Sequence, residues 1–306
     1  MVVSASRRCD IPRFSFDWFL ERLAAGFVEV KNPFNSRQIR QVSLLPSDAE
    51  LFAFWTRDPA AILGHTADLE GRGCDFFVMT TLTSYPAVLE PNVPPAGELI
   101  NTMRRLARKI TPDRVIWRYD PLFLSNITDF AFHRGNFSRL AAGLNGTVKR
   151  VIVSVYDEYG AAERRLTKLE NAGGFPRAPG QPALKRLAHY ENEPKDDIPS
   201  KHGPGKERPL LPGVRELLAE LAGIARKEGM EIQSCAEEDL SGCGIKPGAC
   251  IDAEYIARLF GNKKSGLLNL PKDPGQKRPR CLCAQSVDIG SYGPCPAGCI
   301  YCYGSR

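Results

Sequence analysis

Short apolar segments alternate with longer amphipathic segments along most of the chain. Six segments rich in valine, isoleucine and phenylalanine end in polar or turn residues, as buried strands do. They span residues 2–4, 51–55, 76–80, 115–119, 151–155 and 231–234. Amphipathic stretches predict helices at 16–25, 97–109, 137–143 and 214–227. Strands that alternate with helices in this way predict a parallel sheet.

Six strand units without a dinucleotide-binding glycine pattern favour a barrel-like fold. We expect an α/β protein with a (β/α) TIM-barrel-like architecture, six-stranded or a permuted partial barrel, and a cysteine-rich C-terminal tail. Residues 28–30 and 41–44 predict an extra hairpin that bends near 32–35. We expect a barrel-like domain at 1–240, with a Pro/Gly-rich insertion at 171–213. A cysteine-rich metal-binding segment at 241–306 is expected to pack on this barrel.

Polar side chains follow each of the six predicted strands, and in α/β barrels the chemistry lies where strands end and loops begin. We expect these side chains to line a pocket, although strand ends also become polar simply where they meet water. Arg118, Asp120 and Glu237 are candidates for orienting a substrate or for acid–base catalysis. Arg7 and Arg57 are candidates for binding a carboxylate or phosphate of a cofactor, or for pairing with nearby aspartates.

Composition and charge narrow the class of protein only slightly. The chain has 306 residues, of which 43% are hydrophobic and 25% charged, and its formal net charge is +6. No apolar stretch is long enough to span a membrane and no secretion signal is apparent, so we expect a cytoplasmic protein. No nucleic-acid-binding motif accompanies the positive charge. Nucleophile elbows and phosphate-binding loops are also lacking, which weakens hydrolase and kinase hypotheses.

Ten cysteines are the unusual feature of the composition. Without a secretion signal, clustered cysteines favour metal or redox sites over a disulfide framework. Cys295, Cys299 and Cys302 form a C-x₃-C-x₂-C pattern near the C-terminus. This spacing lets one loop place three thiolates on three irons of a [4Fe–4S] cluster, with Tyr301 covering it and one iron left open. A structural zinc site would need a fourth ligand from elsewhere.

Four further cysteines are candidates for a second metal site. They are Cys235, Cys250, Cys281 and Cys283, and the last two form a C-x-C pair. Together they suit a second iron–sulfur cluster or a zinc ion. Alternatively, one of them supplies the fourth ligand of the terminal cluster, or Cys235 is a small buried residue at a strand end. Cys243 lies between two glycines and is not expected to be a ligand.

The terminal motif, with an aromatic residue before its last cysteine, resembles the cluster motif of radical S-adenosylmethionine enzymes. The segment Gly-Cys-Ile-Tyr-Cys-Tyr at 298–303 is especially similar to that of the spore photoproduct lyase branch. The resemblance implies that S-adenosylmethionine binds the open iron and that a flavodoxin or ferredoxin donates one electron. It also implies radical chemistry on a small-molecule or nucleic-acid substrate. Those enzymes carry the motif after their first barrel strand, whereas this chain carries it at its end.

Most of the chain is also similar to a bacterial family of unknown function, the one numbered eighteen forty-eight among such domains. The matching segments lie at 4–12, 32–35, 54–57, 116–121, 235–237 and 288–292. The family has threonine where this chain has Cys9, so Cys9 is not expected to be a ligand. This resemblance implies no particular activity. Three hypotheses stay open: a radical S-adenosylmethionine-like enzyme, a non-radical iron–sulfur electron-transfer or redox-sensing protein, and a zinc-stabilised binding protein.

Overall fold

The computed structural model describes residues 1–33, 35–171, 184–190, 209–274 and 280–305. The strands are β1 (Val2–Ala5), β2 (Phe27–Asn32), β3 (Asn35–Ser43), β4 (Leu51–Thr56), β5 (Phe76–Thr81), β6 (Val115–Leu122), β7 (Arg150–Val155), β8 (Glu231–Cys235), β9 (Lys246–Gly248) and β10 (Val287–Asp288). The α-helices are α1 (Ile11–Phe14), α2 (Phe16–Ala25), α3 (Ala60–Gly64), α4 (Thr66–Gly71), α5 (Ala96–Ile110), α6 (Phe130–Leu144), α7 (Gly160–Asn171), α8 (Pro212–Lys227) and α9 (Ala253–Phe260). Short 3₁₀ turns lie at Pro112–Arg114, Ser241–Cys243 and Ser265–Leu267.

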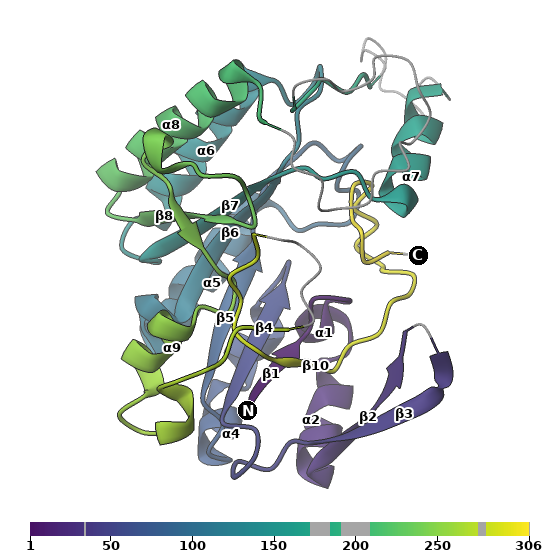
Figure 1. Cartoon of the computed structure of the whole chain (residues 1–306), viewed down its shortest axis with the longest axis vertical. Coiled ribbons are helices and arrows are strands. Elements are labelled where there is room, and N and C mark those ends of the chain that lie inside the picture. The colour runs from purple at the N-terminus through teal and green to yellow at the C-terminus, as the bar shows by residue number, and fades with distance from the viewer. Residues whose placement is uncertain (34, 172–183, 191–208, 275–279, 306) are drawn as a thin grey trace.

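An eight-stranded sheet forms the centre of the molecule (Figure 1). Its strands lie in the order β10-β1-β4-β5-β6-β7-β8-β9, and each neighbouring pair is parallel. The six strands predicted from the sequence are the inner six and follow one another in chain order, which confirms an α/β protein with a parallel sheet. Within the described residues, the edge strands β9 and β10 do not pair with each other, so the sheet is open.

Both faces of the inner sheet are buried, which explains why most of its strands are largely apolar. Along β4, successive side chains point to opposite faces. Phe52 and Phe54 pack into the main core with helices α1–α6 and α8. Ala53 and Trp55 pack into a second core, which contains α9 and the buried Cys281. The C-terminal segment therefore covers the face that most of the helices leave uncovered.

The C-terminal segment reaches both edges of the sheet. Strand β9 pairs with β8, whereas β10 pairs with β1 at the opposite edge. Figure 1 shows the last part of the chain, in yellow, passing β10 and ending beside α7. We call residues 294–305 the terminal loop. The segment predicted at 241–306 thus contributes strands to the same sheet as the residues that precede it.

Several local expectations are also met. Strands β2 and β3 form the predicted antiparallel hairpin outside the main sheet, and residue 34 of its bend lies outside the described residues. The helix predicted at 137–143 is longer, because Asp129 caps α6 by accepting a hydrogen bond from the N–H of Phe132 at 2.8 Å. Most of the predicted insertion at 171–213 lies outside the described residues, and α8 already begins at Pro212.

Candidate functional site

A cavity of about 580 Å³ lies at the carboxyl ends of the inner strands. Each inner strand contributes lining residues at or near its end: Ser6 and Arg7 after β1, Thr56 and Arg57 at β4, Thr81 at β5, Arg118 and Asp120 at β6, Ser154 and Val155 at β7, and Cys235 at β8. Much of the remaining wall comes from the C-terminal segment. The volume falls within the range of small-molecule sites. The predicted pocket at the strand ends is therefore present.

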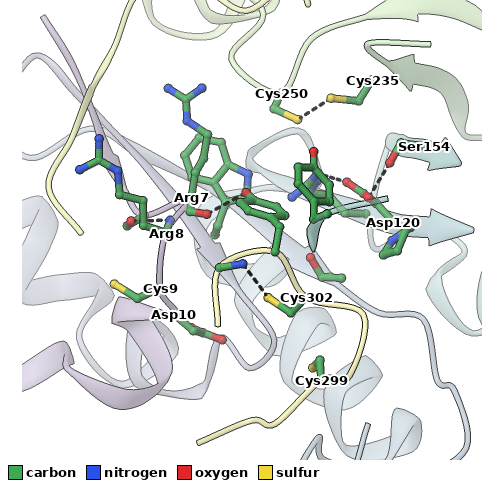
Figure 2. Close-up of a pocket in the computed structure, with 18 of the residues that line it drawn as sticks. Arg7, Arg8, Cys9, Asp10, Asp120, Ser154, Cys235, Cys250, Cys299 and Cys302 are labelled. Atoms are coloured by element: carbon green, nitrogen blue, oxygen red, sulfur yellow. Dashed lines mark hydrogen bonds and ion pairs between the residues drawn. The ribbon is translucent and has the colours of Figure 1, made fainter. Parts of the chain in front are cut away.

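Eight of the ten cysteines line this one cavity. They are Cys9, Cys235, Cys250, Cys281, Cys283, Cys295, Cys299 and Cys302. Figure 2 shows Cys235 and Cys250 on one side of the cavity, well apart from Cys299 and Cys302 on the terminal loop. All of them are free thiols. Within the described residues, no three histidine, cysteine, aspartate or glutamate side chains already stand in the arrangement that holds a metal ion.

The terminal loop turns its backbone amides toward its sulfur atoms. Gly298 lies at the turn with φ of +67°, a conformation that glycine adopts without strain. The N–H groups of Ala297 and Gly298 hydrogen-bond to the thiol of Cys295. The N–H of Gly304 donates to Sγ of Cys302 at 3.3 Å. At Cys295, burial is the larger effect and raises the pKa of the thiol, whereas the N–H donors of Ala297 and Gly298 act in the opposite direction.

Arg165 of α7 forms hydrogen bonds with the backbone of the terminal loop. Its guanidinium donates to the carbonyl oxygens of Ile300 at 3.0 Å and Ser305 at 2.8 Å, and also to that of Cys302. The N–H of Ile300 in turn donates to the carbonyl of Leu89 at 3.0 Å. The sequence analysis missed Arg165, because nothing in the amphipathic pattern of its helix distinguishes it from the other charged residues there.

Arg57 and Tyr301, both predicted to bind a cofactor, are engaged with a buried carboxylate, Glu90. Nη1 of Arg57 donates to Oε1 of Glu90 at 2.7 Å and to Thr83 at 2.8 Å. The hydroxyl of Tyr301 donates to the same oxygen of Glu90, and the N–H of Tyr85 donates to Oε2 at 3.1 Å. The Glu90 side chain is only 2% exposed. This network is an internal anchor of the terminal loop, and the sequence gives no signal for Glu90 beyond a lone acid in an apolar loop.

Arg118 and Asp120, two of the predicted catalytic residues, are hydrogen-bonded to each other in the cavity wall. Asp120 also accepts a hydrogen bond from Oγ of Ser154 at 2.5 Å. Nε of Arg118 is buried and has no hydrogen-bond partner within the described part of the chain. The third predicted residue, Glu237, is not among the described residues that line the cavity. It accepts a hydrogen bond from the N–H of Val155 at 2.9 Å.

Arg7, the remaining predicted cofactor ligand, lies in the wall beside Asp288. The carboxylate of Asp288 accepts hydrogen bonds from the hydroxyls of Ser4 and Ser6, each at 2.7 Å, and from the N–H of Arg7 at 2.8 Å. The guanidinium of Arg7 donates to Oγ of Ser286 at 2.7 Å. Asp288 therefore joins the two ends of the chain. The segments at 4–12 and 288–292, which both resemble the family, thus belong to one structural unit.

Cys235, Cys250, Cys281 and Cys283 are buried, and their thiols form a chain of contacts. The sulfurs of Cys235 and Cys250 lie 3.4 Å apart, Cys250 interacts with Cys283, and Cys283 interacts with Cys281. The contact with Cys235 lowers the pKa of Cys250, but Cys283 and burial together raise this pKa to about 11. Burial likewise raises the pKa of Cys299 to about 11. The thiols of Cys250 and Cys299 are therefore protonated near neutral pH, and a bound metal would displace their protons.

Asp10 is a further carboxylate in the cavity that the sequence analysis did not single out as functional. Its side chain caps α1 by accepting a hydrogen bond from the N–H of Arg13 at 3.1 Å, and it accepts another from the N–H of Arg57 at 2.7 Å. Burial raises the pKa of Asp10 to about 6, although these hydrogen bonds act in the opposite direction. Asp10 therefore exchanges a proton close to neutral pH.

Fold and site together define an α/β protein with an open parallel sheet and a cysteine-lined cavity at the carboxyl ends of its strands. The chain belongs to the family described as a domain of unknown function (DUF1848), whose profile matches residues 2–304. This match confirms the whole-chain resemblance predicted from short segments. No curated protein and no solved structure matches the chain. No helix in the described ranges has the length and apolar character needed to cross a membrane.

Proposed function

We propose that this protein is an iron–sulfur enzyme resembling radical S-adenosylmethionine enzymes, and that Cys295, Cys299 and Cys302 bind its [4Fe–4S] cluster. The observation that carries the proposal is their position on the wall of a cavity that strand-end arginine, aspartate and serine side chains also line. A cofactor held by the terminal loop therefore faces groups suited to binding a substrate. A reduced cluster supplies single electrons to a molecule bound beside it.

The terminal loop suits such a cluster in two respects. Backbone amides already point at the sulfurs of Cys295 and Cys302, and hydrogen bonds to cluster sulfurs tune the reduction potential. Arg165, Arg57 and Glu90 hold the loop against the rest of the fold through hydrogen bonds and a buried ion pair. A rigid support of this kind fixes the position of a cofactor relative to the substrate.

The strand-end residues support binding of an anionic group. The buried Nε of Arg118, which lacks a partner among the described residues, suits a carboxylate or phosphate oxygen of cofactor or substrate. Asp120 is oriented by Arg118 and Ser154 and is placed to accept a hydrogen bond from a ligand hydroxyl or amine. Glu237 accepts a hydrogen bond from the N–H of Val155, a wall residue at the end of β7, and thereby supports this wall.

We also infer that the sheet is a partial barrel. Its inner strands follow one another in chain order, and helices pack on one face, as in a (β/α) barrel. Helix α9 and the cysteine-bearing segment cover the face that would be the interior of a closed barrel. In this interpretation the terminal loop occupies the mouth of the barrel, although it comes last in the chain.

A non-radical iron–sulfur protein that transfers electrons or senses redox state is the second candidate. One observation favours it: Cys235 and Cys250 line the same cavity as the terminal cysteines. A fourth thiolate from this side would close the cluster and leave no iron for S-adenosylmethionine. Both candidates need a one-electron partner, such as a flavodoxin or ferredoxin.

Anaerobic purification with iron and sulfide assays, followed by electron paramagnetic resonance of the reduced protein, tests the proposal. We expect one [4Fe–4S] cluster per chain, with a signal that changes when S-adenosylmethionine is added. Cys299→Ser should lose the signal, whereas Cys243→Ser, a matched control outside the cavity, should keep it. A signal that does not change when S-adenosylmethionine is added, and that disappears in Cys235→Ser, would favour the second candidate. A protein without iron after reconstitution would refute both.

A further inference from the structure

Cys235, Cys250, Cys281 and Cys283 form a second group of thiols, whose first two members lie apart from the terminal loop in Figure 2. They come from three places in the chain: the end of β8, the turn after β9 and the segment before β10. Their exposed fractions lie between 2% and 8%. A single buried cysteine is an ordinary small apolar residue. Four buried cysteines from three segments, whose thiols contact one another in a chain, are candidates for a shared ligand.

The distance between two of the sulfurs suits one metal ion better than a disulfide or a cluster. Sγ of Cys235 lies 3.4 Å from Sγ of Cys250. A disulfide would join these atoms at about 2.0 Å. Tetrahedral thiolates bound to zinc at about 2.3 Å lie about 3.8 Å from one another by simple geometry. An iron–sulfur cube binds each thiolate to a different iron and therefore holds the sulfurs farther apart.

The charge around this group also suits a metal with four thiolate ligands. Four thiolates around one Zn²⁺ leave two negative charges, and buried charges need nearby partners of the opposite sign. Arg7 interacts electrostatically with Cys250 and Cys283. Arg118 interacts in the same way with Cys235 and Cys250. Two guanidinium groups, which also pair with Asp288 and Asp120, thus lie close to the negative charge that such a site would carry.

We propose that Cys235, Cys250, Cys281 and Cys283 bind one zinc ion in a second metal site, distinct from the terminal loop. Coordination requires the four side chains to turn toward one point, because their thiols contact one another in a chain. With four protein ligands the ion is closed to substrate and acts as a structural link. It joins the end of β8 to the segment that leads into β10 and the terminal loop. This site does not depend on the proposed function.

Metal analysis of the full chain, purified anaerobically, tests the assignment. A variant with Cys295→Ser, Cys299→Ser and Cys302→Ser should keep one zinc ion per chain. Cys235→Ser should lose the zinc, whereas Cys74→Ser, which removes a buried thiol outside the cavity, should keep it. Zinc that disappears with the terminal cysteines, or that persists without Cys235, would overturn the proposal.

X-ray absorption at the zinc edge of the unaltered protein keeps the test decisive even if a variant does not fold. We expect four sulfur ligands at about 2.3 Å. Nitrogen or oxygen ligands, iron in place of zinc at these thiols, or a Cys235–Cys250 disulfide detected by mass spectrometry would each overturn the assignment. A protein that holds zinc but no iron would refute the proposed iron–sulfur function while supporting this site, so the two failures are distinguishable.

Discussion

Replacement of Glu90 by glutamine tests whether a buried ion pair holds the terminal loop. Glu90 accepts hydrogen bonds from Arg57, Thr83 and Tyr301 at one carboxylate oxygen, and its side chain is only 2% exposed. Glutamine keeps the shape but removes the charge, so Arg57 stays buried without a counter-charge. Loss of one partner of a buried pair costs about 3–5 kcal/mol. This is a large part of the roughly 5–15 kcal/mol that stabilises a typical domain.

Glu70→Gln is the matched control, because it removes the same charge from a pair whose carboxylate is exposed. Glu70 lies 3.2 Å from Arg114, but its side chain is 49% exposed. Exposed pairs contribute about 0–1 kcal/mol. Urea unfolding followed by circular dichroism gives the free energy of unfolding of each variant. We expect the Glu90 substitution to lower it several times more than the Glu70 substitution does.

Hydrogen exchange shows whether the lost stability concerns the terminal loop. The N–H of Ile300 donates to the carbonyl of Leu89, next to Glu90, so its exchange should accelerate in Glu90→Gln. It should be unaffected in Glu70→Gln. If both variants lose the same free energy, or if Ile300 exchanges at the wild-type rate in Glu90→Gln, the buried pair does not hold the loop and this reasoning is refuted.

Two further predictions concern other parts of the fold. In Gly290→Ala, the new Cβ would overlap Oγ of Ser6, so we expect a loss of about 1–3 kcal/mol in thermal unfolding. The control Gly293→Ala meets nothing within 4 Å, and equal melting temperatures would contradict the prediction. Burial lowers the pKa of His133 to about 4, so its contribution to stability is complete above pH 6.5 and is lost as the pH falls toward 4. The stability difference between wild type and His133→Gln should therefore shrink by about 3 kcal/mol between pH 7 and pH 4, and a constant difference would refute this.

The inner sheet could be predicted because parallel strands buried on both faces leave continuous apolar runs in the sequence. All six predicted strands are found, and each begins within one residue of the expected position. The edge strands were missed for a physical reason. Lys246–Gly248 and Val287–Asp288 have only three and two residues, and neither forms an apolar run. They are defined by pairing with β8 and β1, which a local pattern does not contain.

The candidate ligands could be proposed from the sequence alone, because metal-binding cysteines often follow a recognisable spacing. The residues that hold these cysteines in place could not be predicted. Glu90 and Tyr301 are 211 positions apart, and Arg165 is 137 positions from Cys302. These contacts depend on where the terminal loop passes over the strand ends, and a backbone carbonyl bound by arginine has no sequence signature. Sequence therefore indicates candidate metal ligands more readily than the residues that would position them.

The terminal position of the cysteine motif does not prevent it from serving the strand ends. Parallel strands bring their carboxyl ends to one edge of a sheet whatever their order in the chain. Here β10 pairs with β1, and Asp288 binds Ser4 and Ser6, so the end of the chain returns to its beginning. The terminal loop follows β10 after a short connection, and its cysteines line the cavity at that edge. A cluster loop at the end of this chain can thus occupy the same place as one that follows a first strand.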